Sequence, residues 1–326
     1  MPRSWVDELV RAGAVAASYV PEAATGRADV AELAGAELVE DAELAVHPVA
    51  PGSGPASVAF LDGIQYWRVV AYVGVAPVVR AHVAAAVRRR DRDRRPHTVA
   101  EQARELAIAR LEALSAAQRR ILESGGADLV DLPDAEAAQP ARALEAARQA
   151  VERERVAVEK ALGERAAAGL AEGEWLVVDG VLSESAQLAG HPRALGVIKS
   201  HSAQYFEGAE LERALTIPAG HRTSVFRPRG RARHEVYAWY LRLWPWEGND
   251  LLYGLLRIEA AARAETVARA GAISGWLLRE RAPVSTPDAR WDRLLYPIHD
   301  VETYLKSRVP RELVPLPASR LPRAAS

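Results

Sequence analysis

Two short apolar segments of this chain each end in the dipeptide Asp-Gly. SVAFLDG occupies residues 57–63 and GEWLVVDG occupies residues 173–180. An apolar run of this length that stops at a turn dipeptide predicts a buried strand, and the glycine lets the backbone turn sharply. Each pattern therefore predicts a carboxylate at the rim of a sheet, Asp62 in one case and Asp179 in the other. Asp-Gly is also a common turn signal, so a purely structural origin of either pair stays open.

The other elements were assigned from the periodicity of apolar residues. We expect helices over 1–45, a loop at 47–55, further strands over 65–79, 195–201, 235–246 and 251–260, and helices over 99–123, 141–168, 203–215, 261–282 and after Pro297. This order predicts an α/β (α+β) fold, in which a mixed sheet core carries flanking helices.

The same order divides the chain into two parts. Residues 1–50 are predicted to form an N-terminal helical segment, with partner docking as its candidate role. Residues 51–326 are predicted to form one domain, with a long helical insertion over about 80–170 between the two aspartate strands.

Composition narrows the chemistry. The chain has no cysteine, which excludes disulfides, thiolate metal sites and cysteine nucleophiles. Its formal net charge is −1, so a site for a polyanion has to be local. The most apolar stretch, residues 69–87, is interrupted by Arg80 and His82 and favours a buried strand and helix over a membrane span. Since no secretory signal is recognisable, we expect a cytoplasmic protein without a membrane partner.

Two buried carboxylates on neighbouring strands repel each other unless a cation lies between them. Mg²⁺ and Mn²⁺ prefer oxygen ligands, and a pair of such ions can activate water and stabilise the leaving oxygen of a phosphodiester. Asp62 and Asp179 therefore indicate a divalent-metal-dependent phosphodiester hydrolase.

A third carboxylate ligand is expected on the helix before the second aspartate strand. The segment VERERVAVEK, residues 151–160, offers Glu152 and Glu159 on one face, seven residues apart. We prefer Glu159 because it flanks Val158 and Leu162, and Glu152 is the alternative. On an exposed helix either glutamate could instead pair with a nearby arginine.

Four further residues are candidates for the site. His299, at the start of a helix, could ligate a metal or move a proton, or only donate a hydrogen bond. Lys199 follows an apolar strand and suits a phosphate oxygen of the substrate, with a surface salt bridge as the alternative. Arg242 and Arg257 lie in strands predicted to be core, where a charge needs a substrate or a partner. Glu259 is the candidate partner of Arg257.

An ordered set of segments resembles the NurA nuclease family. They are FLDGIQYW (60–67), WLVVDGVLSES (175–185), LGVIKSHS (195–202), YAWYLRL (237–243), GLLRIE (254–259) and YPIHDVE (296–302). The resemblance implies an RNase H-like core and a Mn²⁺- or Mg²⁺-dependent deoxyribonuclease with single-strand endonuclease and 5′-to-3′ exonuclease activity. It also implies a homodimer that works with a hexameric HerA-type translocase in DNA end resection for repair.

The family's functional residues match particular positions of this chain. Asp62, Asp179 and Glu159 match the metal-binding carboxylates. His299 matches the C-terminal catalytic histidine, and Lys199 matches the lysine of the family's G-x-x-K stretch.

The chain also departs from the family pattern. A serine often follows the first Asp-Gly in the family, whereas this chain has Ile64, and Val181 follows the second. A second interpretation is therefore a weak or inactive DNA-binding adaptor of a translocase complex, with a role in defence against phage. Since the sequence has no P-loop, nucleotide-driven chemistry would need a partner subunit.

Overall fold

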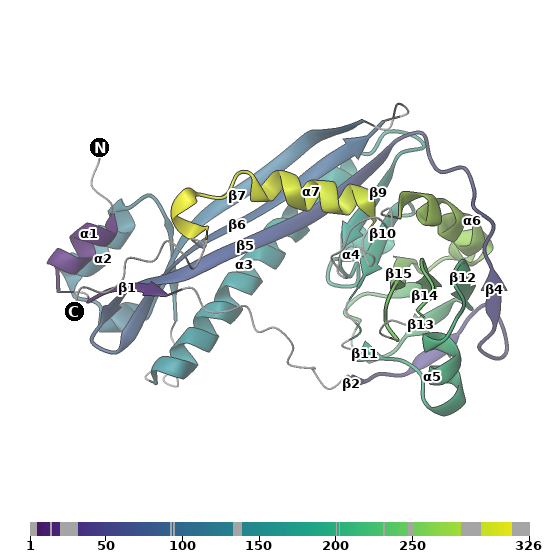
Figure 1. Ribbon diagram of the computed structural model, residues 1–326, viewed down its shortest axis with the longest axis horizontal. Helices are drawn as coiled ribbons and strands as arrows, with labels where there is room; N and C mark the ends of the chain where they lie inside the picture. The colour runs from purple at the N-terminus through teal and green to yellow at the C-terminus, as the bar shows by residue number, and fades with distance from the viewer. Residues whose placement is uncertain are drawn as a thin grey trace.

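The computed structural model describes residues 5–13, 15–19, 32–91, 93, 95–132, 139–199, 201, 203–230, 232–246, 251–281 and 295–314. Across these residues a mixed sheet of 13 strands carries helices on both faces (Figure 1). This confirms the α/β class with a mixed sheet and flanking helices. None of the helices within these ranges is long and apolar enough to cross a bilayer.

The central path of the sheet contains parallel and antiparallel pairs. Its order is β3 (Ala36–Leu38), β13 (Phe226–Pro228), β14 (Val236–Arg242), β15 (Leu255–Ala261), β10 (Ala194–Ile198), β9 (Trp175–Asp179), β5 (Val58–Val73), β6 (Ala76–Arg90), β7 (Pro96–Ala109) and β8 (Asp128–Asp131). Off this path, β1 (Val15–Tyr19) pairs with β5, and β12 (His221–Thr223) pairs with β14 and with β4 (Val46–Pro48). The strands β2 (Glu32–Leu33) and β11 (Ala203–Gln204) form a separate pair.

Helices lie against both faces and at the ends of the sheet. They are α1 (Trp5–Arg11), α2 (Ala116–Ser124), α3 (Pro140–Ala168), α4 (Ala186–Gly190), α5 (Gly208–Leu215), α6 (Ala264–Glu280) and α7 (Tyr296–Lys306). In Figure 1, α1 and α2 lie together at one end of the long strands, and α5 and α6 lie at the other end of the molecule.

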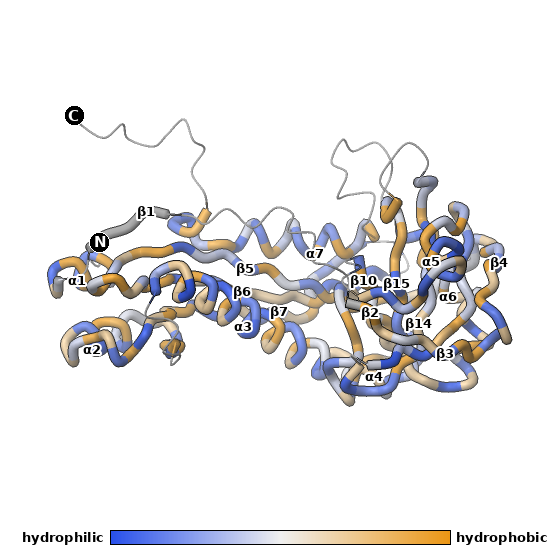
Figure 2. The backbone as a smooth tube through the Cα atoms, turned by 90° about the horizontal axis from the view of Figure 1, so that it is seen from below, coloured by the Kyte–Doolittle hydropathy of each residue, from blue (hydrophilic) through white to orange (hydrophobic). Residues whose placement is uncertain are grey.

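The long antiparallel ribbon β5–β6–β7 is covered on both faces. Figures 1 and 2 show α3 on one side of it and α7 on the other. Leu61 and Val83 pack in one apolar cluster with Val158 of α3. Phe60 packs in another with Ile298 of α7. β5 and β6 are mostly buried on both faces and lack the apolar–polar alternation of a half-exposed strand, whereas the first half of β7 alternates between exposed and partly buried residues.

The predicted helical insertion over about 80–170 is confirmed in its second half, where α2 and α3 lie, and is wrong in its first half. β6 continues to Arg90, and β7 occupies residues 96–109, where most of the helix over 99–123 was expected. The predicted helix over 141–168 is confirmed as α3. Helix propensity in an Ala- and Glu-rich segment is a weak preference, and pairing inside a large sheet overrides it.

The N-terminal prediction also fails. In the described part of residues 1–45, α1 is the one α-helix, and the chain then forms β1, β2 and β3. β3 and β4 pair with β13 and β12, so residues 36–48 belong to the main sheet and not to a separate helical segment. The strands predicted near β9, β10, β14 and β15 and the helices near α6 and α7 are confirmed.

Candidate metal centre

Strand pairing places Asp62 and Asp179 side by side. β5 and β9 are parallel, and the last paired residues are Leu61 and Val178, so the next residue of each strand is an aspartate. β9 ends at Asp179, and Gly180, with φ of 138°, turns the chain away. The sequence predicts that the first strand ends at Asp62. In the structure β5 continues to Val73.

One edge of β5 has no paired strand beyond the end of β9. Among the described strands, β5 has β9 on this edge up to Leu61 and β1 from Val69 onward. The stretch 62–68 between them is called the notch below. Side chains from both faces of the sheet can meet at the notch because no described strand separates them there.

The three predicted carboxylates reach the notch from opposite faces. Asp62 is 8% exposed. It lies two residues from Phe60 and from Ile64 and so shares their face of the sheet, which is covered by α6 and α7. Asp179 lies two residues after Val177 and shares that face as well. Glu159 comes from α3 on the other face, and its carboxylate fills the space beside Gly63.

The charges at the notch act on one another. Burial raises the pKa of Asp62 well above its ordinary value, and the negative charge of Asp179 raises it further. Lys199 and the Gly63 N–H, which donates to Asp62 Oδ1 at 2.7 Å, lower it in part. Burial also raises the pKa of Glu159, with Arg155 opposing this and Asp179 adding to it. The three carboxylates therefore form one electrostatic cluster.

Two cationic side chains compensate this cluster. Lys199 Nζ donates to Asp179 Oδ2 at 2.6 Å. Arg155 donates to Glu159 and also lies 3.2 Å from Gln65 Oε1. Lys199 thus forms the salt bridge that the sequence left open as its alternative role. Arg155, four residues before Glu159, is a nearby arginine of the kind with which that glutamate could be expected to pair.

The alternative third ligand lies away from this cluster. The Glu152 side chain is 49% exposed and pairs with Arg148 at 3.3 Å, whereas the Glu159 side chain is 13% exposed. Of the two glutamates, the structure brings Glu159 to the aspartates.

The donor set of the notch suits a hard divalent cation. Asp62, Asp179 and Glu159 offer carboxylate oxygens only, which Mg²⁺ and Mn²⁺ prefer. Lys199 and Arg155 already supply positive charge where such an ion would bind. In donor type the three residues fit Mn²⁺ or Mg²⁺, but their oxygens as placed do not all lie within 4.8 Å of one another. An ion would bind only where Lys199 and Arg155 give way.

His299 lies on α7, which packs along β5 and β6 (Figures 1 and 2). Its Nε2 lies 2.9 Å from Thr303 Oγ1, and its Nδ1 lies 3.8 Å from Glu302 Oε2 of the same helix. The next residue, Asp300, accepts a hydrogen bond from Arg88 Nε at 2.6 Å and fixes α7 to β6. α7 thus covers the face of the sheet from which the side chains of Asp62 and Asp179 extend. A role of His299 in catalysis stays a prediction.

The two strand arginines differ in their surroundings. Arg242 is fully buried, and its guanidinium donates to the carbonyls of Ile217 at 3.3 Å and Leu251 at 3.1 Å and to those of Leu215 and Tyr253. The predicted contact of Arg242 with substrate does not fit this burial, because the side chain holds loops together. Arg257 is 4% exposed and lies 3.2 Å from Glu259, the partner that the sequence indicated.

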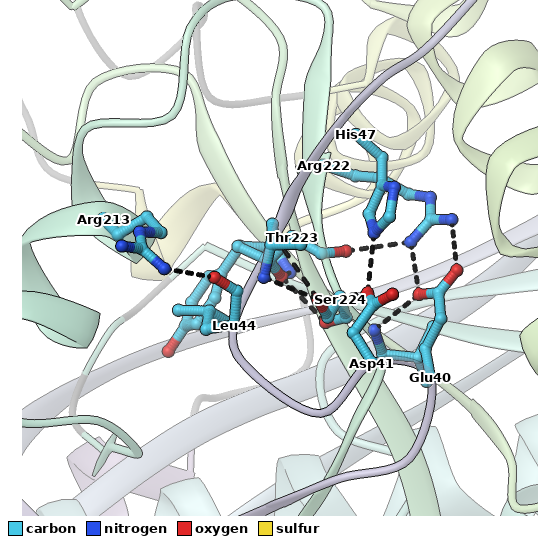
Figure 3. Close-up of polar contacts among 11 residues, drawn as sticks. Glu40, Asp41, Leu44, His47, Arg213, Arg222, Thr223 and Ser224 are labelled. Atoms are coloured by element: carbon cyan, nitrogen blue, oxygen red, sulfur yellow. Dashed lines mark hydrogen bonds and ion pairs between the residues drawn. The ribbon is translucent and has the colours of Figure 1, made fainter.

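A second acidic group, absent from the sequence predictions, lies near β12. Glu40, Asp41 and His47 each place a possible ligand atom within 4.8 Å of the others. Figure 3 shows Arg222 pointing at Glu40, to whose two oxygens it donates at 2.7 Å, and Ser224 Oγ donates to Asp41 at 2.6 Å. Since both carboxylates are engaged, this group ties the 40–47 loop to the sheet.

The described geometry thus gathers Asp62, Asp179, Glu159 and Lys199 at one opening of the sheet. No protein-family model matches this chain, and no curated protein matches its sequence.

Proposed function

We propose that this protein is a divalent-metal-dependent DNA nuclease whose hydrolytic site is the notch. The observation that carries the proposal is the parallel pairing of β5 and β9, which sets the buried Asp62 beside the partly exposed Asp179. The proposal includes an RNase H-like arrangement, with Glu159 as the carboxylate contributed by a helix. Single-strand endonuclease and 5′-to-3′ exonuclease activities are the expected reactions.

Each side chain has a distinct task in this proposal. Asp62, Asp179 and Glu159 would hold Mn²⁺ or Mg²⁺, which when bound supplies activation of water and neutralisation of phosphate charge. The sheet fixes the two aspartates before substrate arrives, and burial keeps bulk water away from them. Lys199 would release Asp179 and donate to a phosphate oxygen of DNA. His299 is the candidate for moving a proton.

The proposed partners are those that the resemblance to the NurA family implies. Without a P-loop, movement along DNA needs a separate ATPase, for which a hexameric HerA-type translocase is the candidate. The expected assembly is a homodimer in the cytoplasm that acts with this translocase in DNA end resection and repair.

One observation favours the second candidate, an inactive DNA-binding adaptor of the same complex. Asp179 and Glu159 are already paired with Lys199 and Arg155, so two of the three carboxylates are neutralised without a metal. In an adaptor these ion pairs would persist, and Mn²⁺ would neither bind nor support cleavage.

The test is cleavage of end-labelled single- and double-stranded DNA with Mn²⁺, Mg²⁺ or EDTA, combined with calorimetric titration of Mn²⁺. Asp62→Asn and Asp179→Asn should each lower cleavage by roughly 100-fold or more. Glu159→Gln should weaken both cleavage and Mn²⁺ binding, and Glu152→Gln is the matched control. Wild-type cleavage by both aspartate variants would exclude the notch as the site. Absence of both cleavage and Mn²⁺ binding, with a translocase present, would establish the adaptor.

A further inference from the structure

A cavity of about 420 Å³, with both polar and apolar walls, lies near the notch. Its walls include Val181, two residues after Asp179, and Ile198, the residue before Lys199. Consecutive Cα atoms are 3.8 Å apart, so the cavity begins within about two residue lengths of the metal centre. A nucleotide that flanks a phosphodiester bound at the notch could reach it.

Two charged side chains form the floor of the cavity. Arg257 is 4% exposed and Glu259 is 2% exposed. Arg257 Nη2 lies 3.2 Å from Glu259 Oε1, and Glu259 Oε2 accepts the backbone N–H of Leu182 at 2.9 Å. The Leu182 bond fixes Glu259 against the turn that follows Asp179. Arg257 and Glu259 alternate with Ile258 and Ala260, so the cavity lies on the face opposite to that of Asp62 and Asp179 and is reached from the notch around this turn.

Arg257 has donors to spare. Its Nε is buried and has no hydrogen-bond partner among the described residues. A buried N–H without an acceptor is unfavourable by about 1–3 kcal/mol, so such a donor needs a specific reason. The ring of Tyr205 lies 5.0 Å from the guanidinium and holds its plane. Because Nε is buried in the ligand-free protein, an acceptor in the cavity would reach it only if the guanidinium turned toward the cavity.

The charge of the cavity argues against a phosphate. Arg257 is balanced by Glu259, and Arg233 at the rim is balanced by Glu184 at 3.3 Å. A balanced site with apolar walls suits a neutral, planar, polar ligand better than a dianion. A nucleobase has this chemistry, and guanine presents the acceptors N7 and O6, which arginine commonly recognises.

We propose that this cavity binds a nucleobase, with guanine as the best match, of the nucleotide next to the scissile phosphodiester. The inference rests on the proposed nuclease function and adds base selectivity to it. Arg257 is the donor to the base edge, Glu259 and Tyr205 are positioning residues, and Val181 and Ile198 contact the flat faces of the base.

The test uses thymidine oligonucleotides that carry one guanine, or one abasic site, at successive positions. Cleavage with Mn²⁺ and DNA binding by fluorescence anisotropy in EDTA are both measured on the intact protein. We expect wild-type protein to cut next to guanine roughly 5- to 100-fold faster than next to thymine, and an abasic site there to remove the preference.

Two variants act on the cavity without leaving Glu259 unbalanced. Arg257→Lys keeps the positive charge but loses the two-pronged guanidinium donor. Val181→Trp places a large side chain at the entrance of the cavity, since Val181 is exposed. Both should abolish the guanine preference, measured within each variant as the ratio of cleavage next to guanine to cleavage next to thymine. Val156→Trp, at an exposed position of α3, is the matched control.

The two proposals fail in different ways. Metal-dependent cleavage without any base preference would overturn the base pocket and leave the nuclease proposal standing. Binding that depends on a terminal phosphate, and is equal for guanine and abasic DNA, would also overturn it. Absence of both cleavage and Mn²⁺ binding with the translocase present would overturn the nuclease proposal, and guanine selectivity in the EDTA binding assay would still support the pocket.

Discussion

The carboxylate of Glu159 occupies the space that a side chain at Gly63 would fill. A Cβ added at Gly63 would collide with Glu159 Oε1 and with the carbons behind it. The backbone of Gly63 is not in the left-handed region, so glycine is required here for room and not for conformation. This close approach brings the carboxylate of Glu159, from the helix on one face of the sheet, to the aspartates whose side chains extend from the other face.

Gly63→Ala should therefore displace Glu159 and leave the fold intact. We expect Mn²⁺ affinity and cleavage to fall together by roughly 10- to 100-fold, the usual cost of disturbing a metal ligand or its support. Calorimetric titration of Mn²⁺ and circular dichroism measure the two effects. Gly271→Ala is the control, because nothing lies within 4 Å of the added Cβ there. Unchanged Mn²⁺ affinity in Gly63→Ala would show that Glu159 is not a ligand.

Lys199→Met should destabilise the metal-free protein. The substitution removes the donor of Asp179 and one of the charges that offset Asp62, so the two buried aspartates repel each other more strongly. We expect a loss of about 1–3 kcal/mol in urea denaturation with EDTA, partly restored by Mn²⁺. Lys160→Met is the control, since that lysine donates to the Glu184 carbonyl at 2.9 Å. Equal stabilities of Lys199→Met and wild type in EDTA would contradict the expected compensation.

Arg242→Met tests the structural role of the buried arginine. Several main-chain carbonyls would lose their donor in the protein interior. The free energy of unfolding should fall by about 1–3 kcal/mol or more, because buried carbonyls are left without a donor. Chemical denaturation of this variant beside Arg148→Met, at an exposed position, measures the difference. A stable Arg242→Met protein with weakened DNA binding would restore the substrate role.

Glu40→Gln should lower stability in a pH-dependent manner. Burial raises the pKa of Glu40, but the hydrogen bonds from Arg222 and the Val225 N–H outweigh it, and the net pKa lies below the ordinary value of 4.5. A carboxyl group with a lowered pKa in the folded state stabilises the protein above the unfolded value, and this stability is lost as the pH falls through the folded value.

At pH 7 we expect Glu40→Gln to cost about 1–3 kcal/mol, and the gap to wild type should close as the pH falls below 4.5. Urea denaturation across this range measures the gap, with the exposed Glu210→Gln as control. A gap that is constant with pH would assign the effect to packing and not to charge.

The sequence predicts the strands and helices whose pattern is local. β9 and β10 are short, uniformly apolar runs bounded by glycine or polar residues, and α3 shows apolar positions at helical spacing. β6 and β7 escape prediction for a physical reason. β6 is rich in alanine and buried on both faces, so it shows no alternation, and the residues of β7 favour helices when taken alone.

The same distinction applies to the site. Asp62, Asp179 and Lys199 follow apolar runs, and the position of Glu159 beside Val158 favours it over Glu152, so their common location could be inferred. The notch could not, because it depends on where β9 ends relative to β5. The hydrogen bonds from Arg242 to main-chain carbonyls and the pairing of Arg222 with Glu40 also join residues that are distant in the chain, so no local sequence pattern predicts them.

The parallel pairing of β5 and β9 has a kinetic consequence. β6, β7, α2, β8 and α3 all lie between these two strands in the chain, whereas β5, β6 and β7 are joined by short connections. Non-local parallel pairing is slow to form, so the antiparallel ribbon should assemble first and the two aspartates should meet late. Substitutions at the β5–β9 contact should then mainly accelerate unfolding and leave the refolding rate nearly unchanged.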